Sequence, residues 1–227
     1  MVELEESTGH AAPPQGGLTC RLAIANFTVM TQDQPFVHAT DAPGKALILQ
    51  EGLRLFARKG LSATSIRDIA QASGLSNPAL YKHFATKDQL ALVLFERLYR
   101  AQLQRVSLTT GQSSTFRLKF RAFLETGLRA VDEHPEATVF VADNLRTLWP
   151  HMPDGLKSRT ILSILRDIIQ LGRSEGDVES CVDENMQLAL VVGMLENITR
   201  QIFFGSLAHP ALAQLHDAEH LLRKALR

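Results

Sequence analysis

The chain has 227 residues, of which 45% are hydrophobic and 21% are charged, and its 24 Lys and Arg balance 24 Asp and Glu. This length is enough to bury one or two hydrophobic cores. No apolar run is long enough to cross a membrane, and the first residues carry Glu3, Glu5 and Glu6 in place of the basic segment of a secretory signal. We therefore expect a cytoplasmic protein. The two cysteines, Cys20 and Cys181, lie far apart in unrelated contexts and indicate neither a disulfide framework nor a metal site.

The charges are unevenly distributed along the chain. Residues 45–105 contain ten Lys and Arg against four Asp and Glu, which leaves fourteen against twenty for the remainder. A basic segment joined to an acidic one favours contact with phosphates at one end of the protein. Chance segregation remains an alternative on the charge pattern alone.

The first 41 residues show no sustained periodicity. They contain Pro13-Pro14 and Gly16-Gly17 among scattered polar residues, which is typical of a flexible arm. Met30 lies about fifteen residues before the first predicted helix. Translation from Met30, with residues 1–29 outside the native protein, is therefore a hypothesis that stays open.

The most informative segment runs from Thr64 to Gln89 and predicts two short helices joined by a tight turn. Gly74 stands where the first helix must end, because the residue after a helix often takes a left-handed conformation that glycine adopts without strain. Ser76 is a suitable N-cap, and Pro78 falls in the first turn of the next helix, where its missing N–H costs nothing. This arrangement is typical of a helix-turn-helix, whose second helix enters the DNA major groove.

The flanking residues narrow the interpretation. An amphipathic helix precedes this segment and ends at Lys59-Gly60, and Thr86 with Gln89 forms a capping box that opens a long helix. Over residues 45–98 this order of motifs resembles the TetR/AcrR-type transcriptional regulators. The resemblance implies an all-α fold with a small DNA-binding domain at the N-terminal end. The family often has Gly-Thr where this chain has Pro78-Ala79, so the operator sequence does not carry over from relatives.

The candidate DNA contacts lie on the predicted recognition helix and at the helix N-termini around it. Asn77 pairs well with adenine, Ala79 offers a methyl contact to thymine, and Lys82 reaches guanine or phosphate. Family analogy places Tyr81 and His83 on backbone phosphates. The complete set is Thr64, Ser65, Ser76, Asn77, Ala79, Tyr81, Lys82, His83 and Lys87. For each polar member, a solvated surface position is the alternative.

The rest of the chain predicts helices separated by turn residues, with residues 107–114 as a linker. The predicted helices span residues 115–132, 137–148, 156–173, 183–204 and a segment after Pro210. No strand-type alternation is evident, so the fold class is all-α. The predicted organisation is an arm over residues 1–41, a DNA-binding domain over 42–104, and a helical effector-binding and dimerisation domain over 105–227.

The resemblance implies a small-molecule effector and a homodimer. Effector binding would swing the helix that starts at Lys87 and separate two recognition helices on a pseudo-palindromic operator. The candidate pocket residues are Phe123, Phe140, Asn144, Trp149 and Leu165. The candidate dimer contacts, on the last two helices, are Leu188, Val192, Leu195, Ile202, Leu215 and Leu222. Plain core packing is the alternative for all of these apolar residues.

Two other classes of function are alternatives. His216, Glu219 and His220 match the H-x-x-E-H pattern of one class of zinc peptidases, but only seven residues follow to supply a third ligand. No catalytic set or cofactor motif is evident, so we expect neither an enzyme nor a cofactor. A DNA-binding protein of the same fold that answers to a protein partner, or organises the nucleoid, remains an alternative. The sequence does not separate repressor from activator or identify the effector.

Overall fold

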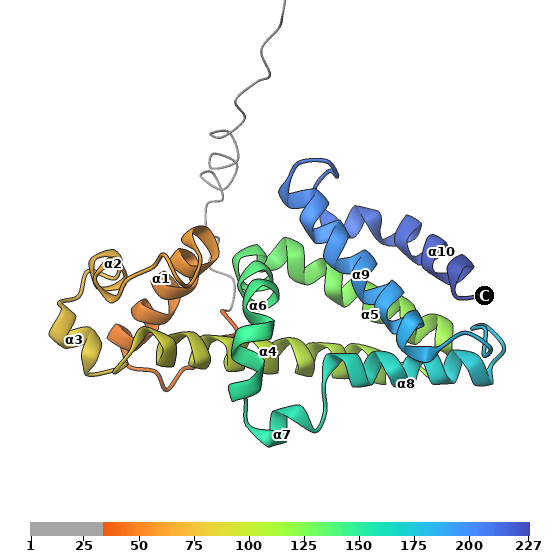
Figure 1. The fold of residues 1–227 in the computed structure, drawn as a ribbon, viewed down its shortest axis with the longest axis horizontal. Helices are drawn as coiled ribbons and strands as arrows, with labels where there is room; N and C mark the ends of the chain where they lie inside the picture. Colours follow the sequence, from red (N-terminus) through yellow and green to blue (C-terminus); the bar gives the residue numbers. More distant parts are fainter. Residues whose placement is uncertain (1–33) are drawn as a thin grey trace, which may run out of the picture. The chain divides into compact units, whose positions relative to one another are not determined.

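The computed structural model describes residues 34–227, apart from the side chain of Phe203. The hypothetical start at Met30, Cys20 and the first 33 residues of the predicted arm lie outside the described residues. Within them every regular element is a helix, which confirms the all-α prediction (Figure 1). No helix among them is long and apolar enough to cross a membrane. The elements are α1 (Pro43–Lys59), α2 (Ile66–Ala72), α3 (Asn77–Tyr81), α4 (Lys87–Gly111), α5 (Phe116–Glu133), α6 (Pro135–Leu148), η1 (Trp149–His151), α7 (Asp154–Lys157), α8 (Ile161–Ser174), α9 (Glu184–Phe203), η2 (Ala211–Gln214) and α10 (Leu215–Ala225).

The first three helices end and begin where the sequence predicts. Gly74 follows α2 with a φ of +68°. Ser76 caps α3, since its hydroxyl accepts a hydrogen bond from the backbone N–H of Ala79 at 3.3 Å. Thr86 caps α4 through the N–H of Gln89 at 3.0 Å, whereas the Gln89 side chain reaches back to the N–H of Ala85 and not of Thr86.

The prediction of a linker over residues 107–114 is wrong, because α4 continues through most of this segment. The hydroxyls of Thr109 and Thr110 donate to the carbonyls of Arg105 and Val106, so these polar side chains are satisfied within the helix. Val106 and Thr110 are also buried, so packing stabilises this last stretch of α4. The connection to α5 is therefore only a few residues long.

The helix predicted over residues 156–173 is two helices, which corrects a second expectation. The short α7 ends at Lys157, and Thr160 then opens α8 with a capping box. Its hydroxyl accepts from the N–H of Ser163 at 2.9 Å, and the Ser163 hydroxyl accepts from the N–H of Thr160 at 2.9 Å. These reciprocal bonds satisfy two N–H groups at the start of α8 and favour a break at this point.

Two hydrophobic cores divide the described chain. The first joins α1, α2, α3 and the first half of α4 to α6, η1 and α7. The second joins the end of α4 to α5, α8, α9 and α10. Leu103 and Ile161 pack against both. Residues 135–157 therefore pack in the same core as the N-terminal helices, although the sequence predicts that they belong to the effector domain.

Two of the links between these parts are aromatic. The ring of Phe140 in α6 stacks on Phe56 in α1, with centroids 5.7 Å apart. Tyr99 of α4 packs against Trp149 at 4.8 Å, and its hydroxyl accepts a hydrogen bond from the N–H of Ile161 at the start of α8. Burial raises the pKa of Tyr99, so its hydroxyl stays protonated at neutral pH.

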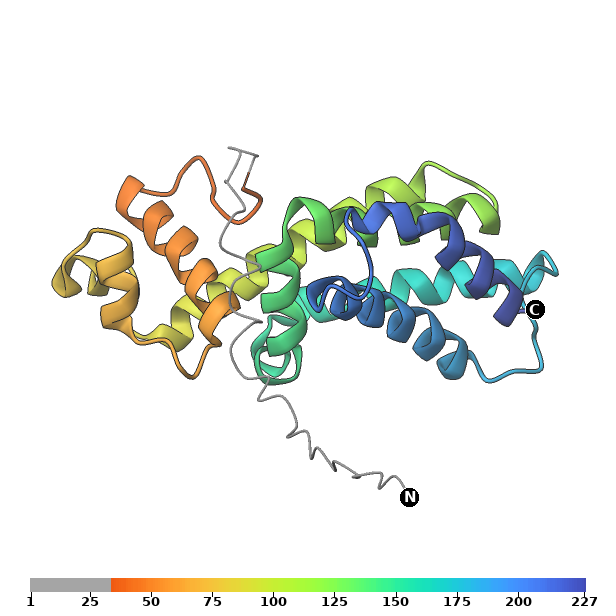
Figure 2. The same cartoon turned by 90° about the horizontal axis from the view of Figure 1, so that it is seen from above.

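The last two helices cover α5. The carboxylate of Asp132 in α5 accepts hydrogen bonds from the backbone N–H groups of Ala211 and Leu212 at 2.6 and 3.0 Å. It thus fixes the start of η2 and the connection between α9 and α10. Figures 1 and 2 show α9 and α10 side by side over α5, with α8 near the N-terminal end of α9.

Candidate DNA-binding surface

The recognition helix α3 is held by two large apolar side chains. Leu80 and Phe84 are 0% and 2% exposed in the first core, and they anchor α3 by one side. The opposite side carries Ser76, Tyr81 and Lys82, all exposed, and Tyr81 leaves 52% of its surface in solvent. A large aromatic side chain with this exposure is available for a partner. The remaining predicted members of α3 and its end, which are partly exposed, are Asn77, Ala79 and His83.

The start of α2 presents a second polar surface. Ser65 caps the helix, and the Asp68 carboxylate accepts hydrogen bonds from both the N–H and the hydroxyl of Ser65 at 2.9 and 2.8 Å. These bonds lower the pKa of Asp68, so the carboxylate is ionised at neutral pH. Arg67 lies between these residues and is exposed. Arg67 is not among the contacts predicted from the sequence, although it stands two residues after Ser65, and its charge next to a helix N-terminus was the available signal.

Two predicted DNA contacts lie elsewhere. Thr64 is only 1% exposed, and its hydroxyl donates to the carbonyl of Gly60 at 2.9 Å, where α1 ends. The Nζ of Lys87 donates to the carbonyl of Leu61 at 2.7 Å, which fixes the loop between α1 and α2. Both side chains thus hold the end of α1, and neither is placed as a free surface group. Lys82 and Arg67 are the basic side chains left exposed beside the turn.

The sequence of the helix-turn-helix segment matches a known family of proteins. The sequence model of the bacterial regulatory proteins of the tetR family matches residues 48–94, from α1 into α4. Over this segment the chain is similar to the TetR family. Members are transcriptional regulators and not enzymes, in agreement with the prediction from the sequence.

Three similar proteins define how far the likeness extends. The transcriptional repressor Rv3405c of Mycobacterium tuberculosis is 47% identical over 53 residues, which cover 23% of this chain and 28% of the repressor. The repressor KstR2 of the same species is 27% identical over 138 residues, which cover 57% of this chain and 66% of KstR2. The chain thus matches about a quarter of the first relative's length. The regulator FadR of Bacillus subtilis, crystallised in complex with stearoyl-CoA, has a TM-score of 0.67 at 16% identity over 80% of this chain and 98% of FadR, which shows a shared fold.

The five candidate pocket residues do not come together. Phe140 lies in the first core, whereas Phe123 and Leu165 lie in the second. Asn144 donates to the carbonyl of Phe140 at 2.8 Å within α6, and Trp149 packs on Tyr99. Four of the five therefore pack in a core, and the fifth, Asn144, bonds to the backbone of its own helix.

The six candidate dimer residues face the core of their own subunit. Leu188, Ile202, Leu215 and Leu222 are buried in the second core, and Val192 and Leu195 pack against it. The outer side of α9 instead exposes Met186, with 65% of its surface in solvent, and Leu190, with 39%. Periodicity located the buried stripe of α9 but did not show that apolar residues also lie on its other side.

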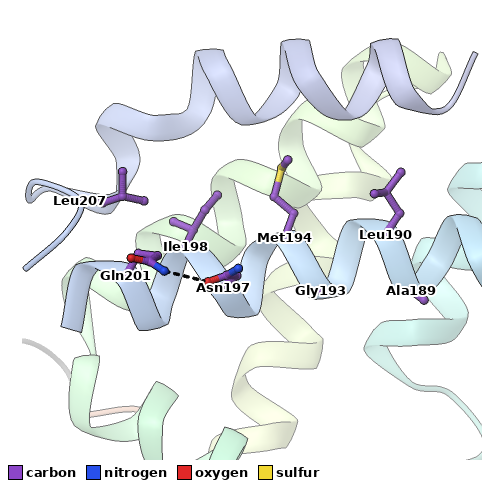
Figure 3. Close-up of a pocket in the computed structure, with 8 residues that line it drawn as sticks. All are labelled: Ala189, Leu190, Gly193, Met194, Asn197, Ile198, Gln201 and Leu207. Carbon is purple, nitrogen blue, oxygen red and sulfur yellow. Dashed lines mark hydrogen bonds between the residues drawn. The ribbon is translucent and has the colours of Figure 1, made fainter. Parts of the chain in front are cut away.

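The outer side of α9 forms an open hollow of about 470 Å³. A Cβ on Gly193 at its centre would meet no atom within 4 Å. Figure 3 shows Leu190, Met194 and Ile198 along one side of α9, with the amides of Asn197 and Gln201 hydrogen bonded at 3.4 Å beside them. The residues around it are Ala189, Leu190, Gly193, Met194, Asn197, Ile198, Gln201 and Leu207.

The H-x-x-E-H motif is not assembled as a metal site. His216 and His220 are exposed on α10, while the Glu219 carboxylate accepts from Arg121 at 2.6 Å and lies 3.8 Å from Arg223. Among the described residues no group of three or more His, Cys, Asp and Glu is placed to hold a metal ion.

Proposed function

We propose that the protein is a homodimeric, sequence-specific DNA-binding regulator, most simply a cytoplasmic repressor released by a small-molecule effector. The observation that carries this proposal is the capped helix α3, which is anchored by Leu80 and Phe84 and presents an exposed polar side. The name of Rv3405c as a transcriptional repressor supports the direction of regulation.

In the proposed complex, α3 reads base edges with its N-terminal residues Asn77 and Ala79. Tyr81, Lys82 and Arg67 contact phosphates, since each is exposed beside the turn. Ser65 and Ser76 contribute the polar N-termini of α2 and α3. Lys87 acts through the loop that it fixes, not through a phosphate.

The proposed dimer uses the outer side of α9, not its buried stripe. Small and apolar residues gather there, and Gly193 leaves room for a second helix to approach closely. A two-fold pair of α9 helices would cover Met186 and Leu190, which are large and exposed in the single subunit. A dimer also explains how a short recognition helix reads enough sequence, because it places two copies on two half-sites.

The effector is proposed to act where α6 and α8 meet α4. Phe140 ties α6 to α1, and the hydroxyl of Tyr99 accepts from the first turn of α8, so displacement of either helix would reach the DNA-binding helices. The bound stearoyl-CoA of FadR favours a molecule with a long apolar part. The second core, rich in Phe and Leu side chains, is the part suited to receive it.

A protein partner is the second candidate signal. One observation favours it: none of the five candidate pocket residues lines either of the two best-formed hollows of the described structure, and Phe123, Phe140, Trp149 and Leu165 pack in its two cores. Adding stearoyl-CoA, octanoyl-CoA or free coenzyme A to the complex of the protein with DNA separates the two candidates. Release of DNA by the long-chain thioester alone supports the small-molecule effector, whereas no release by any of them favours the protein partner.

DNA binding itself is tested by recovering fragments of genomic DNA on the full-length protein. Specific fragments that share a two-fold symmetric sequence support the proposal. Uniform recovery of all fragments would contradict it.

A further inference from the structure

A buried carboxylate lies just before α1. The Asp41 side chain is only 3% exposed and accepts hydrogen bonds from Arg97 of α4, with Nη2 of Arg97 at 3.1 Å from Oδ1 and Nη1 bonded to Oδ2. Lys45 Nζ lies 2.8 Å from Oδ1, and the N–H of His38 lies 2.8 Å from Oδ2. A carboxylate with four such donors has a defined position, because the paired bonds to a guanidinium fix both distance and direction.

The same arginine holds the segment that leads into α1. Arg97 Nη1 also donates to the carbonyl of Phe36 at 2.9 Å, and the Phe36 ring is 6% exposed in the first core. Residues 34–41, which the sequence analysis placed in the arm, are thus fastened to α4 by a ring and by an ion pair. They lie before residues 48–94, which the family model matches.

This contact leads to the recognition helix. Two residues after Asp41, α1 begins, and its first turn lies against the residues just before and just after α3. A Cβ placed on Gly44 would lie 3.3 Å from Nε2 of His83, just after α3, and 3.7 Å from Cδ1 of Leu75, just before it. A shift of the first turn of α1 would therefore displace α3 from either side.

We propose that Arg97 and Asp41 are positioning residues for DNA recognition: their ion pair fixes the first turn of α1, and through it α3, relative to α4. The inference rests on the proposed DNA-binding function. Specific binding depends on where base-reading side chains lie, whereas non-specific binding depends mainly on the number of neutralised phosphates. Loss of the ion pair should therefore reduce specific binding selectively.

The test uses full-length protein and two duplexes of equal length. One is selected by the wild type from a random-sequence pool, and the other is its scrambled sequence. Asp41→Asn and Arg97→Gln should each weaken binding to the selected duplex by about tenfold, the cost of one misplaced base contact. Their binding to the scrambled duplex should stay within about twofold, since the phosphate contacts remain. The double variant should lose no more than the stronger single variant, because both changes break one link.

Arg100→Gln is the matched control. Arg100 also lies on α4 and forms an ion pair, but its partner Glu96 is one turn away on the same helix and both are solvent-accessible. This variant should bind both duplexes like the wild type. An NMR signal of the His83 ring should shift in Asp41→Asn and Arg97→Gln and stay in place in Arg100→Gln.

The outcomes separate the two proposals. If the wild type enriches no sequence from the pool, the DNA-binding function fails. If the wild type selects a duplex and the Asp41 and Arg97 variants bind it within about twofold, the positioning role is overturned while the function stands. An equal loss on both duplexes, with an unchanged His83 signal, would also overturn it, because a merely smaller folded fraction lowers both affinities together.

Discussion

The ring of Phe140 in α6 lies stacked on the ring of Phe56 in α1, with their centroids 5.7 Å apart and their planes inclined by 18°. Both rings are almost fully buried, and the ion pair of Arg58 with Glu136 lies between the same two helices at 3.4 Å. The core that contains α1 therefore does not end at α4, because it also includes α6, which begins more than seventy residues after the end of α1.

Phe140→Ala should consequently destabilise the fold by about 3–5 kcal/mol, as expected for a large cavity in a core. Urea unfolding, followed by circular dichroism, measures this loss. Leu145→Ala on the same helix is the control, because Leu145 is 41% exposed and should change stability by less than about 0.5 kcal/mol. Equal effects of the two changes would show that α6 does not belong to this core.

Lys82 and Lys87 should behave differently, although the sequence predicts a DNA contact for both. Lys82 is exposed on the far side of α3, so Lys82→Ala should reduce the salt dependence of DNA binding by about one phosphate contact. Lys87 donates to the carbonyl of Leu61 at 2.7 Å, so Lys87→Ala should lower thermal stability by about 1 kcal/mol and leave the salt slope unchanged. A reduced salt dependence of DNA binding for Lys87→Ala would instead show that Lys87 contacts a phosphate.

Two neighbouring residues of α9 distinguish the dimer surface from the subunit core. Gly193 has no atom within 4 Å of a built Cβ, whereas Val192 packs against the second core. Gly193→Asp should keep the helical circular dichroism, sediment as a monomer and lose operator binding, since a dimer would bury two unpaired carboxylates. Val192→Asp should instead lower the stability of the subunit itself. A Gly193→Asp protein that still forms a DNA-binding dimer would exclude this side of α9 as the interface.

The Asp41 carboxyl gives a pH prediction. Hydrogen bonds from Arg97 hold its pKa well below its usual range, and those from Lys45 act in the same direction. A carboxyl whose pKa is lowered by folding stabilises the native state above its unfolded pKa of about 4, and this contribution is lost as the pH falls toward the folded pKa. The stability difference between the wild type and Asp41→Asn should be constant from neutral pH to about pH 5 and shrink below about pH 4. A difference that persists undiminished at pH 3 would contradict this role.

Local patterns in the sequence predicted the helices and their caps. Gly74 and Ser76 have the roles that their chemistry indicates, because a cap depends only on residues within one turn. The polar residues Thr109 and Thr110 favour a linker in the sequence, but their hydroxyls bond to the helix carbonyls of Arg105 and Val106 and so do not interrupt α4. Propensity alone does not reveal that outcome.

The site was harder to predict because several side chains act over long distances in the sequence. Lys87 meets Leu61 and Arg97 meets Asp41 only in the folded chain, so no spacing rule finds either contact. The apolar stripe of α9 was visible, but a stripe does not indicate whether it faces its own subunit or a partner. In the structure Leu188 is buried in its own subunit, whereas Leu190 is exposed.

If α3 reads DNA as one of two symmetric copies, base preferences selected from a random-sequence pool show this most directly. The wild type should enrich two inverted half-sites whose centres lie about one helical turn, or a multiple of it, apart. Asn77→Ala should keep this spacing and relax the preference at one position in each half-site, at a cost of about 1–3 kcal/mol against the wrong base. A single unsymmetric site, or an Asn77→Ala protein with the same preference at every position, would contradict the account.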